Sequence, residues 1–572
     1  MPATSAPRSL GARLLPGLAV LRAYRRPWLR TDVFGGLTVG AMLIPQSMAY
    51  AELAGMPPVA GFYAVIGALV IYALAGTSRH LGVGPEPGTA ILAATGVGAI
   101  AAGDPGRYLA LMAALALVVA AICIAAAVVR LGFVSSLLSK PVLVGYITGV
   151  GLTLLSSQIA GFTGVDIEGD TFVPRFAELL GELGDIHWPT LVVGAAALGV
   201  IVGLRQWAPQ LPGALIGVVG AGVAVALLDL DADGIALIGA IPAGLPTPAV
   251  PDVSWSDMAA LLPVAAGVAL VGFTDNLLTA RSIAARRRDP EAAPIDANQE
   301  LLALGLTNLS AGFSQGFPVS SSASRTAVPA SLGSTTQLVS LIAAASVVVS
   351  LTAGRSLLEH IPRPALAAVI IAAALAIIDA PGFRDLWRVS RTDAAIAVAT
   401  TLGVIVFDVL VGVVVAVVLS VLAALSHMAR PHDAVLGDLA GLDGWVDVDA
   451  YPDATTEPGL LVYRFDAPLF FMNAGRFRAR VEQVLEDNVG REEWLVLDFE
   501  GVGSLDTTAV DALGELLEDL DEAEVAVVAV ARAIDPVLDV LDRAGLLAPT
   551  GPLVSFPTIN AAVRAYRDRA GS

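Results

Sequence analysis

Arg325 is the residue whose type and position most strongly suggest chemistry. It lies in the stretch 316–326, which reads GFPVSSSASRT between apolar segments. A charged side chain in a lipid-embedded segment costs about 2.5–3.5 kcal/mol on insertion scales unless it is paired or hydrated. A guanidinium, serine hydroxyls and the free N–H groups of a helix start would together bind an anion. The alternative is a structural arginine that pairs with a carboxylate.

A second interrupted segment, 84–90, reads GPEPGTA. A proline at a helix start leaves no N–H group unsatisfied, and Gly88 would let a ligand approach the backbone. Pro85 and Pro318 are 233 residues apart, and each segment is the third apolar stretch of its half of the chain. Such a pair indicates a transporter site built from inverted repeats, where two helix N-termini and Arg325 face one anion. The alternative is an ordinary turn between two spans.

Two further pairs of residues on apolar segments are candidates for the same site. Asp275 and Thr279 are four residues apart, so they share one helix face and could hold a sodium ion or a proton. The alternative is that Asp275 is only a counter-ion for Arg325. On the first apolar stretch, Gln46 could donate a hydrogen bond to an oxyanion and the Tyr50 ring could wall the pocket. For Tyr50 the alternative is packing between helices.

The composition determines which elements can position these residues. The chain has 572 residues, of which 56% are hydrophobic and 15% charged. A soluble globular chain carries about 25% charged residues, so these values exclude a soluble enzyme, a disordered protein and a nucleic-acid-binding protein. The single cysteine, Cys123, can form neither an internal disulfide nor a paired metal site. Residues 431–572 contain 27 acidic and 10 basic side chains, which indicates a water-exposed, acidic C-terminal part.

The apolar stretches predict about fourteen membrane-embedded segments, two of which, 85–101 and 317–330, are half-helices. The other twelve lie near 33–55, 57–75, 109–129, 133–160, 188–203, 212–228, 258–280, 299–313, 336–353, 364–378, 392–408 and 411–426. Threading them from the arginine-rich N-terminus places most basic loop residues inside, which satisfies the positive-inside rule and makes both termini cytoplasmic. Glu52 and Glu300 lie near the ends of spans, and we expect both to face water.

The C-terminal part changes its hydrophobic period. Residues 459–471, 494–502 and 525–530 are strand-like, and residues 506–523, 535–546 and 559–569 are helix-like. We therefore expect four parts: a cytoplasmic N-terminal segment (1–30), a transmembrane transport domain (31–428), a linker (429–458) and a small α/β domain (459–572).

These motifs resemble those of the SulP family of anion transporters. The resemblance rests on 44–50 (IPQSMAY), on 76–80 (GTSRH) with the Gly84-Pro85 pair, and on 318–325 (PVSSSASR). On the 7+7 inverted-repeat fold that the two interrupted segments indicate, the resemblance implies a core and a gate, an anion held between the third and tenth helices, and a homodimer. It also implies the site residues, which are Gln46, Tyr50, Pro87, Gly88, Thr89, Ser322, Ala323, Ser324 and Arg325.

The same resemblance implies a coupling site and a regulatory domain. Sodium-coupled bicarbonate members use an Asp and a Thr one turn apart, as at Asp275 and Thr279. Glu86 stands where many members carry a neutral residue, so it could be a proton-coupling carboxylate or could deter anions. The tail is similar to STAS domains, and Thr508 falls at the position of their phosphorylatable serine. The alternative there is that Asp506 simply caps the following helix.

Together these features predict a secondary active transporter of a small inorganic oxyanion in the cell inner membrane, with the tail in the cytoplasm. Sulfate is the first choice, because Arg325 and two helix ends supply enough positive charge for a dianion. A proton or sodium gradient would drive uptake by alternating access. The alternatives are a sodium-dependent bicarbonate symporter, an uncoupled anion channel and a membrane-anchored STAS regulatory protein. Neither an enzyme, a cofactor, a metal site nor a nucleic-acid partner is expected.

Overall fold

The computed structural model describes two compact units, one up to Ser420 and one from Val421 onward. The described residues are 15–133, 139–167, 169, 172–230, 232, 234–242, 244–287, 294–407, 409–442, 444–487, 493–549 and 551–570. The first unit is almost entirely helical, and the second contains a six-stranded sheet. The boundary between them falls within helix α20 (Val409–Ala429).

Each apolar stretch expected from the sequence overlaps a helix of the first unit or α20, which crosses the boundary between the units. Residues 134–138 of the expected stretch 133–160 lie outside the described residues. The helices are α2 (Pro16–Arg22), η1 (Arg26–Trp28), α3 (Leu29–Leu53), α4 (Pro58–Ala75), α5 (Pro87–Ala101), α6 (Pro105–Val128), α7 (Lys140–Ser157), α8 (Ile159–Thr163), α9 (Phe172–Gly181), η3 (Leu183–Asp185), α10 (Trp188–Trp207), α11 (Gly213–Leu227), α12 (Trp255–Arg287), α13 (Ala297–Phe313), α14 (Ala323–Ser331), α15 (Leu338–Thr352), α16 (Arg355–Glu359), α17 (Arg363–Ile377), α18 (Ala380–Val389), α19 (Arg391–Val406) and α20.

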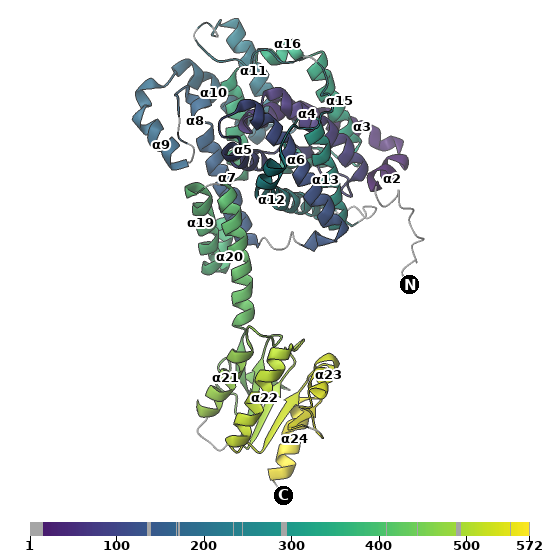
Figure 1. Cartoon of the computed structure of the whole chain (residues 1–572), viewed down its shortest axis with the longest axis vertical. Coiled ribbons are helices and arrows are strands. Elements are labelled where there is room, and N and C mark those ends of the chain that lie inside the picture. Colours follow the sequence, from purple (N-terminus) through teal and green to yellow (C-terminus); the bar gives the residue numbers. More distant parts are fainter. Residues whose placement is uncertain are drawn as a thin grey trace. The chain divides into compact units, whose positions relative to one another are not determined.

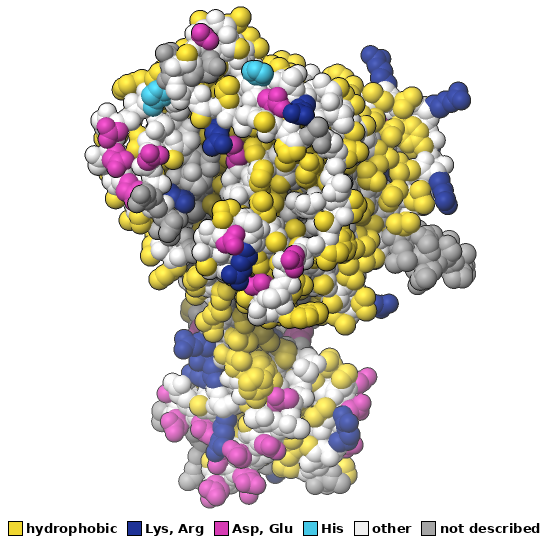
Figure 2. Space-filling model, turned by 45° about the horizontal axis from the view of Figure 1, so that its top comes forward, with side chains coloured by type: hydrophobic (Ala, Val, Ile, Leu, Met, Phe, Trp, Pro, Cys, Tyr) yellow, Lys and Arg dark blue, Asp and Glu magenta, His cyan; other side chains and the backbone are white. Residues whose placement is uncertain are grey.

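The helices and the surface of the first unit suit a lipid bilayer. The described part of the chain contains six helices that are long and apolar enough to cross a membrane, and three shorter apolar helices, α5, α11 and α15. Large hydrophobic side chains such as Trp188, Val200, Leu227 and Leu402 are exposed on their surfaces. Figure 2 shows hydrophobic side chains over most of the visible surface of the helical unit, whereas Asp and Glu side chains are frequent on the C-terminal unit. An aqueous protein rarely exposes so large an apolar area.

Helices from the two halves of the chain pack against each other in the core. The pairs α6–α13, α3–α15 and α4–α13 make close contact, and Figure 1 shows the purple and teal helices side by side. Small residues permit these approaches: a Cβ atom on Gly61 of α4 would lie 1.9 Å from the backbone oxygen of Ser47 on α3. Helices that associate without a hydrophobic driving force rely on such small residues. A second set of contacts joins α7 to α19 and α10 to α11 and α17.

The two interrupted segments form a short sheet before each becomes helical. Strand β1 (Val83–Gly84) pairs antiparallel with β2 (Ser320–Ser321), with Val83 opposite Ser321 and Gly84 opposite Ser320. Helix α5 then begins at Pro87 and α14 at Ala323. The expected half-helix 317–330 is therefore helical only in its second part. The reason is that the preceding serines pair with β1 instead of continuing a helix.

The C-terminal unit is an α/β domain, as the sequence predicted, and its sheet is mixed. The strands are β3 (Asp433–Asp438), β4 (Trp445–Asp447), β5 (Leu460–Phe465), β6 (Trp494–Asp498), β7 (Val527–Ala531) and β8 (Leu553–Phe556), in the order β4-β3-β5-β6-β7-β8. Strands β5 to β8 are parallel, and β3 and β4 are antiparallel. Helices α21 (Ala474–Asp487), α22 (Thr507–Glu522) and α23 (Asp535–Arg543) supply one apolar core, and α24 (Ile559–Ala570) supplies a second.

The interval 429–458, which we expected to be a linker, instead contributes β3 and β4 to this sheet. Both strands are short, and β3 gains its place by pairing with β5 from Asp433 to Val435. That pairing depends on a partner distant in the chain, so the local pattern did not show it. The sequence prediction also missed α21 and β8.

A buried carboxylate ties the carboxyl ends of β5 and β6 to the residue after β7. Asp498 is fully buried and accepts hydrogen bonds from Arg464 Nε at 2.7 Å and from Arg532 Nε at 2.9 Å. Glu500 pairs with the same Arg532 through its NH1 at 2.6 Å. Because a buried charge is tolerated only when it is paired, this network holds three segments of the sheet together.

Candidate functional site

The two interrupted segments meet, as the sequence led us to expect. Besides the β1–β2 pairing, the Ser322 N–H donates to the Gly82 carbonyl oxygen at 3.0 Å. The Gly82 N–H in turn donates to Thr326 Oγ1 at 3.0 Å. These bonds place the starts of α5 and α14 beside each other, although 233 residues separate Pro85 from Pro318.

Two buried asparagines hold β2 in position, and the sequence analysis did not identify them. Asn308 of α13 accepts from the Val319 N–H at 2.9 Å and donates to the Val319 carbonyl at 3.0 Å, as a neighbouring strand would. Asn276 of α12 accepts from the Ser321 N–H at 2.6 Å. Both side chains are fully buried. An amide inside an apolar helix is the signal that could have revealed them, since such groups must find polar partners.

Arg325 lies at the centre of this junction and is only 1% exposed. Its NH1 donates to Gln46 Oε1 at 3.4 Å, whereas Nε and NH2 have no hydrogen-bond partner. Glu86 and Asp275 interact with it electrostatically, but neither accepts a hydrogen bond from those two atoms. A buried guanidinium with unpaired N–H groups is costly. The geometry therefore differs from that of a structural arginine locked to one carboxylate, and it suits an anion binding at this point.

Glycines let the segment that contains β1 pack closely against Arg325. A Cβ atom on Gly82 would be 3.0 Å from Arg325 Cβ, and one on Gly84 would be 3.6 Å from Arg325 NH2. On the other side of the junction, a Cβ atom on Gly272 of α12 would be 3.3 Å from Ser320 Cβ. Any larger side chain at Gly82 would push against the arginine, so β1 depends on glycine for its approach.

Glu86 occupies the helix end that we expected to face the anion. It is the N-cap of α5, and its Oε2 accepts from the Thr89 N–H at 2.9 Å. Thr89 Oγ1 donates back to the Glu86 carbonyl at 3.1 Å. A carboxylate is favoured there by the free N–H groups and by the helix dipole. The positive end of α5 is thus satisfied by a side chain of the chain itself.

Asp275 contacts the second interrupted segment directly. Its Oδ2 accepts from Ser321 Oγ at 2.5 Å, which links α12 to β2. Thr279, one turn later on α12, is half-buried, and no hydrogen bond among the described residues joins it to Asp275. The structure thus brings Asp275 to the junction but does not pair it with Thr279.

The other expected site residues divide into buried and exposed groups. Gln46 and Tyr50 are 8% and 3% exposed and lie one turn apart on α3. On α5, the expected site residues Pro87, Gly88 and Thr89 are all buried. On the other segment, Ser322 is half-buried, and Ala323 and Ser324 are exposed at the start of α14. The junction therefore has a closed side and an open side.

The expectation that Glu300 faces water is wrong. Its side chain is fully buried and accepts from Tyr72 Oη at 2.8 Å, from the Thr77 N–H at 2.8 Å and from Thr77 Oγ1 at 2.5 Å. The Ser78 N–H adds a fourth bond at 3.3 Å. Carboxylates that are buried need such donors. Glu300 therefore anchors the loop that leads from α4 into β1.

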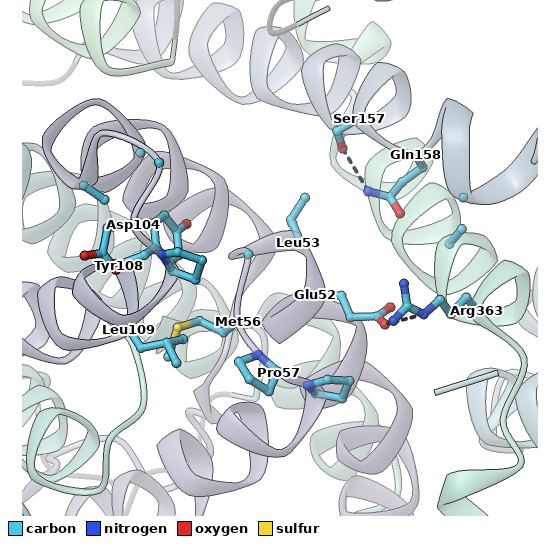
Figure 3. Close-up of a pocket in the computed structure, with 18 residues that line it drawn as sticks. Glu52, Leu53, Met56, Pro57, Asp104, Tyr108, Leu109, Ser157, Gln158 and Arg363 are labelled. Atoms are coloured by element: carbon cyan, nitrogen blue, oxygen red, sulfur yellow. Dashed lines mark hydrogen bonds and ion pairs between the residues drawn. The ribbon is translucent and has the colours of Figure 1, made fainter. Parts of the chain in front are cut away.

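Glu52, the other carboxylate expected near water, is partly exposed and lines a cavity of about 860 Å³. Its Oε1 lies 3.8 Å from Nε of Arg363 on α17 (Figure 3). This cavity includes none of the residues around Arg325.

In the C-terminal domain, the capping interpretation of Asp506 is confirmed. Its Oδ1 accepts from the Ala509 N–H at 2.8 Å at the start of α22, and its Oδ2 accepts from the Phe471 N–H at 2.8 Å. Thr508 is exposed in the first turn of that helix.

Comparison with known proteins shows what the chain is similar to. Residues 29–400 match the Sulfate permease family, and residues 451–560 match the STAS domain. A probable sulfate transporter of Mycobacterium tuberculosis is 46% identical over 563 residues, covering 98% of this chain and 100% of that protein. The structure of the mouse anion transporter Slc26a9 in its inward-facing state is similar, with a TM-score of 0.88, 24% identity, and coverage of 99% of this chain and 96% of that one. The transmembrane domain of the cyanobacterial bicarbonate transporter BicA gives a TM-score of 0.60 at 25% identity, over 69% of this chain and 98% of that one.

Proposed function

The chain belongs to the sulfate permease family, and on that premise we propose that it is a secondary active transporter of sulfate. Members of this family are transporters and not enzymes. Arg325 and its neighbours would bind the anion, a cation gradient would drive uptake, and transport would proceed by alternating access between a core and a gate.

The buried arginine is the observation that carries the proposal. Arg325 has two unpaired N–H-bearing atoms at the point where α5 and α14 begin. Once the neighbouring Glu86 and Asp275 carboxylates are neutralised by a coupling cation, the charge of Arg325 and two helix ends, each equivalent to about half an elementary charge, sum to about two positive charges. That sum matches a dianion such as sulfate better than a monovalent anion. Gln46 supports the assignment because its side chain already contacts the guanidinium.

Proton coupling is supported by the position of Glu86. While its carboxylate caps α5, an anion that approaches this helix end must compete with a negative charge already there. Protonation neutralises Glu86 and removes that competition, so a proton and an anion would bind together. Sulfate uptake should therefore increase as the pH falls.

Asp275 supports sodium as the alternative coupling ion. Its carboxylate and Ser321 Oγ are hard oxygen ligands 2.5 Å apart, and Thr279 lies one turn further along α12. The likeness to a cyanobacterial bicarbonate transporter makes sodium-dependent bicarbonate uptake the second candidate function.

Sulfate uptake into proteoliposomes tests the proposal. Labelled sulfate and labelled bicarbonate are supplied in turn, with an inward proton gradient, an inward sodium gradient or neither. We expect sulfate accumulation that requires the proton gradient and is lost in Arg325→Gln. Arg384→Gln, which removes an exposed arginine on α18, is the matched control and keeps wild-type uptake. Accumulation of bicarbonate but not of sulfate, driven by the sodium gradient, would favour the second candidate. Anion flux that follows the anion gradient without accumulation would indicate a channel.

The remaining assignments follow from charge and from the resemblance to the family. The arginine-rich N-terminus and the acidic tail support an inner-membrane protein with both ends in the cytoplasm. A homodimer is the expected assembly. The tail would regulate transport or contribute to dimer contact. Loss of all uptake on deleting 431–572, together with unchanged uptake in Asp275→Asn, would instead favour a membrane-anchored regulatory protein.

A further inference from the structure

A cavity of the helical unit lies away from Arg325. It measures about 860 Å³ and lies where α3 and α5 end, where α6 and α17 begin, and beside the end of α7. By the topology expected from the sequence, this is the outer side of the membrane domain. In Figure 3, Glu52 and Leu53 extend from α3 on one wall, and Arg363 extends from α17 on the opposite wall.

The charges in this cavity are unequally engaged. Arg363 is the basic residue of the lining, and its side chain is 57% exposed. Asp104 caps α6 by accepting from the N–H groups of Gly106 at 2.9 Å and Arg107 at 3.1 Å, so its carboxylate already has donors. Glu52 approaches Arg363 only to 3.8 Å, near the outer limit for an ion pair. An exposed pair of this kind holds its partners weakly.

The two walls are separately anchored. Tyr108 Oη donates to the Ala54 carbonyl oxygen at 2.7 Å and fixes the end of α3 to α6. The Arg363 N–H donates to the Ala236 carbonyl oxygen at 2.9 Å and fixes the start of α17. The Glu52–Arg363 pair therefore spans two supported walls, and its arginine is available to a solute in the cavity.

Helix α3 connects this cavity to the buried site. Gln46 and Glu52 are six residues apart on α3, which corresponds to about 9 Å along the axis at about 1.5 Å per residue. Gln46 contacts Arg325, and Glu52 contacts Arg363. Helix α3 thus carries one side-chain partner for Arg325, which is Gln46, and one for Arg363, which is Glu52.

We propose that Arg363 is a capture site for an inorganic oxyanion at the outer mouth of the pathway, and that Glu52 is its internal competitor. An arriving anion takes the place of the Glu52 carboxylate on the guanidinium. The exchange releases the contact between α3 and α17 as the anion enters. This inference rests on the proposed function and adds a second anion site to it.

Initial rates of sulfate uptake, measured across sulfate concentrations, test the proposal. Glu52→Gln removes the competitor, so KM falls about two- to fivefold, the range of a weak exposed ion pair. Arg363→Gln removes the capture site, so KM rises by a similar or larger factor while kcat changes little. Arg363→Lys keeps the charge and stays near the wild-type KM. In the Arg363→Gln background, Glu52→Gln no longer changes KM.

The Arg107–Asp257 pair is the matched control. It joins α6 to α12 at 2.6 Å, and neither residue lines the cavity. Asp257→Asn keeps the wild-type KM. A rise of KM in both Glu52→Gln and Arg363→Gln would show a purely structural ion pair and overturn the inference. Unchanged KM in both variants would overturn it as well. Wild-type protein without any sulfate uptake would contradict the proposed function itself.

Discussion

Replacing Glu86 by glutamine separates its charge from its role as a helix cap. The glutamine amide oxygen can still accept from the Thr89 N–H, as the carboxylate now does at 2.9 Å. Helix α5 should therefore keep its start, and the protein should fold. What disappears is the negative charge that competes with an anion for the positive end of α5.

The size of the effect follows from the difference between two hydrogen bonds. A bond to a charged acceptor contributes about 1.5–3 kcal/mol and a neutral one about 1 kcal/mol. An anion that displaces the carboxylate must overcome this difference of about 0.5–2 kcal/mol, which corresponds to about 2- to 30-fold in affinity. Glu86→Gln should therefore lower the KM for sulfate by that factor. The dependence of uptake on pH should flatten, because no proton is needed to neutralise the residue.

The assay is sulfate uptake into proteoliposomes at several pH values, with Asp296→Asn as the control. Asp296 caps α13 in the same way, accepting from the N–H groups of Asn298 at 2.9 Å and Gln299 at 3.2 Å, but it lies at an exposed helix end. The control should keep the wild-type KM and pH profile. If folded Glu86→Gln shows the wild-type KM and pH profile, or binds sulfate more weakly, the competition argument is refuted.

Three further substitutions probe the supports of the fold, each by thermal unfolding of the purified protein. Glu300→Ala removes a fully buried carboxylate that accepts four hydrogen bonds. It should lower the free energy of unfolding by about 3 kcal/mol or more. A decrease of less than about 1 kcal/mol would contradict this role. Asp498→Ala leaves Arg464 and Arg532 without their buried partner, and it should destabilise the C-terminal domain by about 3–5 kcal/mol. Asp506→Ala removes the cap of α22 and should cost about 1 kcal/mol, so a neutral effect would argue against capping.

The sequence predicted the helices of the membrane domain well because their signal is local. Long apolar runs interrupted by Gly and Pro mark spans and their breaks, and the breaks at Pro85 and Pro318 pointed to segments that do meet. Arg325 was found because a charge is conspicuous in an apolar stretch. These features need no knowledge of a distant partner.

What the sequence did not reveal depends on partners far apart in the chain. Nothing near Ser321 shows that it pairs with Val83. Asn308, which hydrogen-bonds to the backbone of Val319, is uncharged and is therefore hard to single out in an apolar segment. Glu300 lies near a helix start, where water is the usual neighbour, but the loop after α4 surrounds it with donors. Likewise, β3 becomes a strand only through its pairing with β5.

The two interrupted segments meet where β1 pairs with β2, and an engineered disulfide tests this contact. Directly opposed residues of antiparallel strands have Cα atoms about 4.5–5.5 Å apart, within the range that a disulfide spans. Val83→Cys and Ser321→Cys, combined with Cys123→Ala to remove the natural cysteine, should therefore crosslink on oxidation. Val83→Cys with Ser331→Cys, at the far end of α14, should not. A crosslink detected by mass spectrometry only in the first pair would support the junction around Arg325, and its absence there with efficient crosslinking of the second pair would contradict it.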